Sequence, residues 1–477
     1  MADIPECEPV SGLLEKRGGE LISIDSEPLA EQLQKYFNPA ISWEDYKRHA
    51  NMLTANYHRF KPEAAWLLLR GTEFRADALI RYIFKPLDHR WAFYSEKRPL
   101  WNDPRPQLAQ HAQPGNHFLV TRRIAQVEEE GAPFYFTRHL GDNDALRGHA
   151  NFIPVWLHDE QGRRLAPNLS LKLRGYLRHL DIRPDLEWSE DDCARLVWWH
   201  VLAVGFAPVY LNTYGRVLRE NWPHVPFPGM EDRCRLRDGG RDTGDDSFAV
   251  FQARDLFFNS ARLGRRVAAL LDIEAKPGDY PAECDPANLE KELAIISPIT
   301  TKDGRAPDAT DSFDVSAGWG KRIQRKRIHE QSVVLPKAGR MLRRPYTNEE
   351  RRALERQGLE RGLHAGAVYD ALGPDTCDIF LNDRLHWRNI PARVWGFAIG
   401  GYPILRKWLS YRERDILGRG LHRQEVDGFS EISRRLAALR LLEPALDHSF
   451  SRLRDATSGT DPVMAAPATG HRRKGKG

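Results

Sequence analysis

The chain has 477 residues, of which 41% are hydrophobic and 29% charged, and its formal net charge of +5 is only mildly basic. This length allows two to four domains with a large core, and the composition is that of a soluble globular protein. Five scattered cysteines without a C-x-x-C pair do not indicate a disulfide framework or a zinc site, and no signal peptide or membrane-length apolar run occurs. We therefore expect a cytoplasmic protein with no metal site and no membrane partner.

Residues 1–74 have a mixed composition in which two short helices are predicted. The segment LAEQLQKYF after Pro28 favours the first helix. Ser42 is a typical helix N-cap and is followed by acidic residues, so a second helix is predicted from Trp43 onward. No residue pattern in this region has a chemical signature.

Residues 75–275 are predicted to form a first lobe in which strands are followed by helices. From Arg81 to Tyr94 the string RYIFKPLDHRWAFY predicts two strands joined by a Pro-Leu-Asp turn. Further strands are expected within residues 116–121, 134–137 and 151–158. Ser189 is predicted to cap a helix that continues to Trp222, before prolines end it.

A second helix is predicted over residues 251–271, with Arg262, Arg265 and Arg266 on or near its outer face. Beside the earlier turn, Asp88 and Arg90 are close enough in sequence to interact. Such a pair is able to act in catalysis, but an ion pair at a turn is more often structural, and we favour that interpretation.

Residues 276–454 are predicted to form a second lobe with strands, a charged helix over 346–375 and an amphipathic helix over 424–442. The tail, residues 455–477, is too polar to bury a core and is predicted to be disordered. The predicted fold class is therefore α+β, with a strand-rich N-terminal lobe, a helical middle and a second mixed lobe.

A dense basic cluster lies within the second lobe. Its candidate DNA-binding residues are Lys321, Arg322, Arg325, Lys326, Arg327, Arg340, Arg343 and Arg344. A cluster in which nearly all charges are positive can neutralise phosphates, and arginine can also hydrogen-bond guanine edges. We therefore favour the interpretation that this cluster binds a polyanion. The alternative is a solvated, charge-rich pair of strands or a subunit contact.

The stretch from Leu381 to Arg412 is the least generic part of the chain. Its apolar residues require a core, and the Gly400-Gly401 pair predicts a tight turn or a backbone pressed against a partner. A short helix is predicted after the turn. Leu405, Trp408 and Leu409 are predicted on one side of it, while Arg406, Lys407 and Arg412 face elsewhere and form a basic surface flanked by aromatic residues. The alternative is a core helix whose charges are merely solvated. Tyr402 and Trp408 belong to the structural motif of this stretch together with the two glycines.

Three strings, which follow one another along the chain as they do in the family, resemble the C-terminal target-recognition region of type ISP restriction–modification enzymes and their fused type II relatives. They are RYIFKPLDHRWAFY around Asp88 and Arg90, VYLNTYGRVLRENWPHVPFP and NIPARVWGFAIGGYPILRKWLSYR. Lys85, Leu87 and His224 depart from the residues usual in that family. The resemblance covers roughly residues 75–450 and implies a DNA-recognition function.

The relatives methylate adenine, and many also cut DNA. Methylation requires a glycine-rich loop for S-adenosylmethionine and an N/D-P-P-Y/F loop for the flipped base, and neither motif occurs in the chain. There is also no G-x-x-x-x-G-K-S/T loop, and Glu274-Ala275-Lys276 is only superficially similar to half of a nuclease motif.

We therefore predict a noncatalytic recognition module that positions a separate methyltransferase or restriction subunit on double-stranded DNA. S-adenosylmethionine would enter only through that partner, and residues 1–74 would be the docking or linker region. Two alternatives remain: a member of the adenine methyltransferase family with its own or remnant activity, and a noncatalytic assembly protein.

Reversing the charges of Arg325, Lys326 and Arg327 together is expected to weaken duplex-DNA binding and flatten its salt dependence, because phosphate contacts release counterions. Affinities measured at two salt concentrations test this. Unchanged affinity and slope would place the DNA footprint elsewhere.

Overall fold

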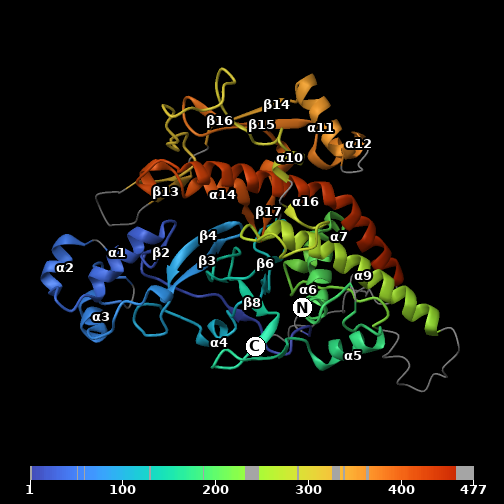
Figure 1. Cartoon of the computed structure of the whole chain (residues 1–477), viewed down its shortest axis with the longest axis horizontal. Coiled ribbons are helices and arrows are strands. Elements are labelled where there is room, and N and C mark those ends of the chain that lie inside the picture. Colours follow the sequence, from blue (N-terminus) through green and yellow to red (C-terminus); the bar gives the residue numbers. More distant parts are fainter. Residues whose placement is uncertain are drawn as a thin grey trace, which may run out of the picture.

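The structure is a computed structural model with mixed α and β elements, which confirms the predicted fold class (Figure 1). It describes residues 3–50, 52–57, 60–127, 130–185, 187–230, 246–286, 289–324, 333–336, 339–360 and 365–457. Most of the predicted tail, residues 458–477, lies outside this description. The predicted boundaries at residues 74, 275 and 454 stay predictions.

The N-terminal helices are α1 (Ser26–Phe37), α2 (Trp43–His49) and α3 (Pro62–Leu69). As predicted, the Ser42 hydroxyl caps α2 by accepting a hydrogen bond from the Asp45 N–H at 3.1 Å. Rings of Tyr36, Tyr46 and Trp66 pack edge to face or tilted between these helices. This aromatic cluster packs the three helices against one another, and it is continuous with the core of the protein.

Two four-stranded sheets and a two-stranded ribbon form the strand-rich part of the first lobe. One sheet has the order β1 (Val10–Ser11), β8 (Asn151–Pro154), β5 (Phe118–Thr121), β6 (Tyr135–Thr137). The other has the order β2 (Ile22–Ser23), β4 (Asp88–Phe93), β3 (Leu79–Lys85), β7 (Leu140–Gly141). The ribbon pairs β9 (Trp156–His158) with β10 (Arg164–Pro167). The predicted hairpin is β3–β4, and short helical turns occur at Ala76–Ala78 and at α4 (Pro106–Ala109).

The helical middle consists of α5 (Leu171–His179), α6 (Glu190–Phe206), α7 (Pro208–Leu218) and α9 (Asp246–Leu271). Ser189 begins α6 with the predicted cap, in a capping box with Asp192. The prediction of one helix to Trp222 is wrong. Pro208 has no N–H to continue the hydrogen-bond ladder, so the chain turns by 89° between α6 and α7.

No single helix within the described ranges has the length and apolarity of a membrane span, although the bent pair α6–α7 together reaches both. The residues of α6 from Leu196 onward are buried inside the protein. The apolar run in this region is therefore accounted for by the core.

The second lobe contains a four-stranded sheet of order β11 (Ile299–Thr301), β16 (Leu385–Pro391), β15 (Asp375–Phe380), β14 (Met341–Pro345). Beside it lie α10 (Leu289–Glu292), α11 (Asn348–Glu360), α12 (Ala365–Leu372) and the hairpin β12 (Lys321–Gln324)–β13 (Val333–Pro336). The remaining short elements are α13 (Ala392–Trp395), β17 (Ala398–Ile399), β18 (Tyr402–Pro403), α14 (Ile404–Ser410) and α15 (Arg414–Leu417).

The long helix α16 (Arg423–Ala456) runs between the sheet of the second lobe and the helices of the first (Figure 1). It extends the predicted helix by several turns and contacts α9, α7 and α12. Its buried Arg435 donates hydrogen bonds to the carbonyls of Ala269, Leu270 and Asp272 at the end of α9. These bonds satisfy carbonyls that lack partners within α9 and fix the two helices together.

We expect Gly264→Ala to destabilise the protein by about 1–3 kcal/mol or more, the usual cost of overpacking. Helices α6 and α9 pack along each other, and a Cβ at Gly264 would overlap the backbone carbonyl of Trp199. Gly215→Ala on α7 is the matched control, since no atom lies near its added Cβ. Urea unfolding of both variants tests the close contact between α6 and α9. A Gly264→Ala protein as stable as wild type would contradict this contact.

Candidate functional site

The Gly400-Gly401 pair forms the predicted tight turn, between β17 and β18. Both glycines have positive φ angles, 53° and 80°, a region that residues with a Cβ rarely adopt. Gly400 N–H donates to the Ala132 carbonyl and Gly401 N–H to the Glu130 carbonyl, both at 2.8 Å. The backbone is thus pressed against the first lobe, where a Cβ on Gly400 would overlap Leu146.

After the turn, Ile404, Leu405, Trp408 and Leu409 of α14 are buried. The helix ends at Ser410, and the next residues return toward the β3–β4 hairpin. The Arg412 guanidinium donates a hydrogen bond of 2.9 Å to Asp88 Oδ1, and the Arg90 guanidinium donates one of 2.9 Å to Asp88 Oδ2. The predicted pair of Asp88 and Arg90 is therefore present as a structural ion pair.

Arg412 was expected to contact DNA, and the structure corrects this expectation. Its side chain is buried, lies 3.8 Å from the centre of the Trp408 ring and is bonded to Asp88. Burial alone would raise the pKa of Asp88, but the charges of Arg412 and Arg90 outweigh it and lower that pKa to about 2. Arg412 therefore holds the fold and is not available to a phosphate.

Part of the basic cluster is also engaged internally. Arg344 donates paired hydrogen bonds to Glu350 and to Asp378, at 2.7–3.0 Å. Hydrogen bonds to Glu350 and Asp378 raise the pKa of Arg344 against the opposing effect of burial. The expectation that Arg344 contacts DNA is corrected for this reason: its charge is neutralised within the second lobe.

Arg340, just before β14, and Arg343, on β14, are exposed and form surface ion pairs with Asp383 and Asp375, both at 2.8 Å. Such pairs are weak and exchange easily for a phosphate. Arg325, Lys326 and Arg327 lie outside the described residues, as do the side chains of Lys321 and Arg322.

The exposed face of α14 carries Arg406, which has no ion pair among the residues described. Lys407 Nζ lies 4.7 Å from the centre of the Tyr411 ring and 5.5 Å from that of Tyr402. Arg406, Lys407 and Tyr402 therefore form the accessible part of the predicted basic and aromatic surface, which we call the α14 surface.

A model of the type ISP C-terminal specificity domain matches residues 11–271 and 307–437. The chain belongs to this family. All three strings of the resemblance lie inside the matched ranges, and the buried contact of Asp88 with Arg412 joins two of them. The third string forms α7 and the turn after it, where Tyr210 Oη donates to the His224 carbonyl.

A comparison with solved structures gives similar chains at low sequence identity. The cryoEM structure of the DrdV–DNA complex is similar with 14% identity and a TM-score of 0.50, over 94% of this chain and 35% of that one. The structure of a nuclease-deletion mutant of the type ISP enzyme LlaGI with a DNA substrate mimic has 11% identity and a TM-score of 0.47, over 93% of this chain and 28% of that one. No curated protein sequence matches significantly. The specificity domain spans about a third of the DrdV chain.

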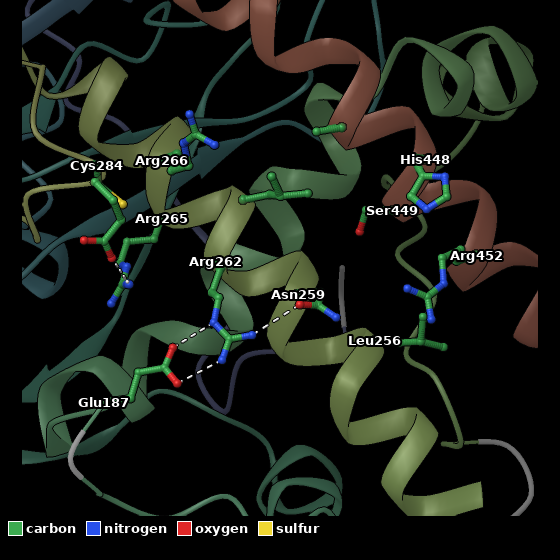
Figure 2. A pocket seen from close by; sticks show the side chains of 13 residues that line it. Glu187, Leu256, Asn259, Arg262, Arg265, Arg266, Cys284, His448, Ser449 and Arg452 are labelled. Carbon is green, nitrogen blue, oxygen red and sulfur yellow. Dashed lines mark hydrogen bonds and ion pairs between the residues drawn. The ribbon is translucent and has the colours of Figure 1, made fainter. Parts of the chain in front are cut away.

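The long helices of the specificity domain enclose a cavity of about 560 Å³ (Figure 2). Arg262, Arg266 and Arg452 line it from α9 and α16, and Arg262 is held by Glu187. The prediction that Arg265 lies on or near the outer face is wrong, since Arg265 is buried, pairs with Glu283 and stacks on Trp188. Arg266 is exposed, so its positive charge is accessible to an anion at this cavity.

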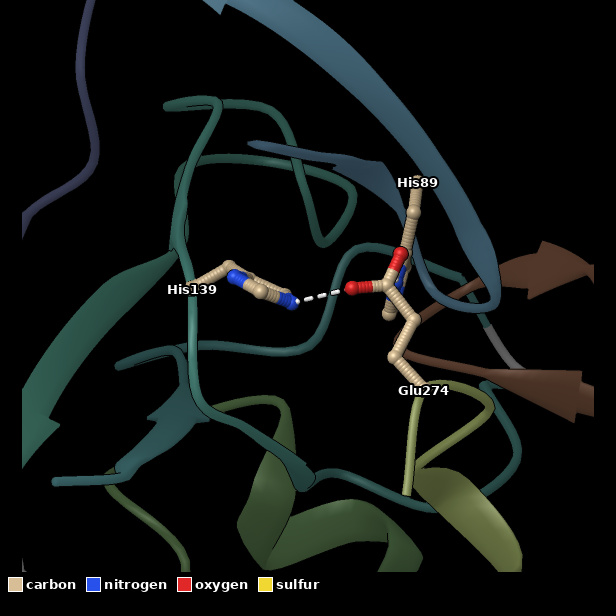
Figure 3. Close-up of side chains that lie close together, drawn as sticks. All are labelled: His89, His139 and Glu274. Carbon is tan, nitrogen blue, oxygen red and sulfur yellow. Dashed lines mark hydrogen bonds and ion pairs between the residues drawn. The ribbon is translucent and has the colours of Figure 1, made fainter. Parts of the chain in front are cut away.

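Sequence reasoning missed one group, in which His89, His139 and Glu274 come together (Figure 3). No pattern in the sequence joins them, because Glu274 is 135 residues from His139 and lies outside the matched ranges. The Glu274-Ala275-Lys276 string singles out the glutamate in the sequence, but it does not indicate the two histidines that contact it.

Replacing Asp88 by asparagine is expected to destabilise the protein by about 3–5 kcal/mol, because buried Arg412 loses its hydrogen-bonded counter-charge and keeps only the carboxylate of Glu425, 3.8 Å away. The difference from wild type should shrink as the pH falls from about 4 to 2. In that window the unfolded carboxyl takes up a proton near its ordinary pKa of 3.8, while folded Asp88 keeps its charge down to about 2. Urea unfolding at several pH values measures this.

Asp383→Asn is the matched control for that experiment, because its ion pair with Arg340 is at the surface and its side chain is 94% exposed. This change should leave the unfolding midpoint almost unmoved. Equal effects of the two substitutions would contradict the special role of the buried pair.

Proposed function

We propose that the chain is the DNA target-recognition module of a restriction–modification system and that it positions a separate adenine methyltransferase or nuclease. The observation that carries this proposal is the match of the specificity-domain model to residues 11–271 and 307–437. The similar DrdV structure is described as a complex with DNA, which agrees with it.

The catalytic steps are assigned to a partner for two reasons. The sequence has neither the glycine-rich loop nor the N/D-P-P-Y/F loop that adenine methylation requires. The second reason is that the family model matched is that of the specificity domain, over residues 11–271 and 307–437. In this proposal S-adenosylmethionine is held by the partner.

DNA contacts are assigned to cations that the fold leaves accessible. Arg406 on α14 and the surface residues Arg340 and Arg343 meet this condition. From the sequence alone, the basic segment around Arg325 is a further candidate. Phosphate contacts of this kind fix the register of the protein on the duplex, and a few base contacts in the grooves then supply specificity.

The contact with the partner is assigned to the surface of the N-terminal helices. On α3 the adjacent side chains of Leu67 and Leu68 are 61% and 69% exposed, near the half-buried Trp43. The start of α1 contacts the second lobe, where Asp25 pairs with Arg419 at 2.6 Å, while α2 and α3 lie at one end of the molecule (Figure 1). An apolar patch at this place suits a protein contact that leaves the α14 surface accessible to DNA.

The proposal is tested by selecting bound duplexes from a random oligonucleotide pool at two salt concentrations. A short enriched motif is expected, with affinity that falls as salt rises. Arg406→Ala should reduce the slope of log affinity against log salt by about 1 if Arg406 meets a phosphate. Arg48→Ala on α2, an exposed arginine away from this surface, is the matched control and should leave the slope unchanged.

Absence of DNA binding at low salt would overturn the proposal. Binding of S-adenosylmethionine to the chain alone, measured by calorimetry, would favour an enzyme with its own activity. Salt-sensitive binding without a motif would contradict sequence recognition by the chain alone.

A further inference from the structure

Three side chains from distant segments converge at the edge of the first lobe (Figure 3). His89 lies on β4, His139 lies between β6 and β7, and Glu274 follows the end of α9. His139 Nε2 is 2.8 Å from Glu274 Oε2, and His89 Nδ1 is 3.1 Å from Glu274 Oε1. Two imidazoles and one carboxylate thus direct their ligand atoms into one small space, all within 4.8 Å of one another.

The hydrogen bonds of His89 determine which of its nitrogens carries the proton. Its Nε2 is 3.2 Å from Tyr135 Oη, and the single hydroxyl proton of Tyr135 is directed to the Leu271 carbonyl. The hydroxyl oxygen must then accept from His89 Nε2–H, as it also accepts from the Leu87 N–H. In the neutral ring this leaves a lone pair on Nδ1.

That lone pair faces a carboxylate. The His89 side chain is only 3% exposed, and its Nδ1 lies 3.1 Å from Glu274 Oε1. Two acceptor atoms at this distance share a cation, which is either a proton or a metal ion.

The surroundings do not supply that cation in full. Arg81 binds Glu274 Oε1 from one side and stacks on Trp91. Arg138 is shared by Asp272 and Asp279. Both guanidinium groups are thus already paired with carboxylates.

We propose that His89 Nδ1, His139 Nε2 and Glu274 Oε2 bind a divalent transition-metal ion, with Zn²⁺ the best fit. Two imidazole nitrogens and a carboxylate are ordinary zinc ligands, and a fourth position is left for water. Side-chain exposures of 16% for His139 and 26% for Glu274 give that position access to solvent. Tyr135 and Arg81 act as the outer partners that orient His89 and Glu274.

The ion would join the strands of the first lobe to the end of α9. This end of α9 is also where Arg435 of α16 caps the helix, so the site fixes the junction on which both long helices depend. The role is structural and independent of DNA binding.

The experiment uses the full chain without a polyhistidine tag, with Zn²⁺ and Co²⁺ as probes. One Co²⁺ per chain is expected, with the visible absorption of a four-coordinate site, and Zn²⁺ should displace it. His139→Ala and Glu274→Gln should abolish stoichiometric binding. Tyr135→Phe keeps the ring but loses the bond to His89, and should weaken the affinity about 10–100-fold.

His149→Ala is the matched control, because His149 belongs to the same lobe but its side chain is 74% exposed. It should bind the ion as wild type does. Thermal melting of each variant without metal separates loss of the site from loss of the fold. The proposal is overturned if wild type takes up no Co²⁺, or if folded His139→Ala protein takes up as much as wild type. In that case His89 is a doubly protonated imidazolium paired with Glu274.

Discussion

The buried contact of Asp88 with Arg412 is the constraint on which the arrangement of this specificity domain depends. The two residues are 324 positions apart, and their side chains are 3% and 5% exposed. Neither charge tolerates such burial alone, because the desolvation of an unpaired ion is far more costly than any local strain. The hairpin of the first lobe and the segment after α14 must therefore meet. Arg90 binds the second oxygen of Asp88 from the hairpin side, and Glu425 lies 3.8 Å from Arg412 Nε.

This contact also determines which side chains of α14 are left for other molecules. With Arg412 held inward and the Gly400-Gly401 turn pressed against the first lobe, the helix can bury Leu405 and Trp408 in only one orientation. Arg406 is then directed outward. Arg406 and Arg412 lie only six residues apart and look alike in the sequence. Arg406 is accessible to other molecules, whereas Arg412 is buried and holds the fold.

Local signals in the sequence predict the helices and strands, but they do not predict which residues that are distant in the chain come into contact. Ser42, Ser189 and the turn before Asp88 predicted their helices and strands because caps and turns act over a few residues. The helix break at Pro208 is not predicted, because the apolar pattern continues on both sides of this proline. The burial of Arg412 and Arg265, and the meeting of His89 with Glu274, depend on residues far away in the chain, and no periodicity encodes them.

A basic stretch is for the same reason a poor guide to a phosphate contact. Arg344 lies in the cluster that looks most suited to DNA, yet Glu350 and Asp378 neutralise it, and both come from elements that the cluster itself does not contain. Arg343, the preceding residue, has its side chain on the other face of β14, where a single surface carboxylate binds it weakly. The alternation of a strand thus divides neighbouring arginines between the core network and the surface. What DNA meets is the charge that remains after the internal pairs are made, which is a property of the fold and not of the net charge of +5.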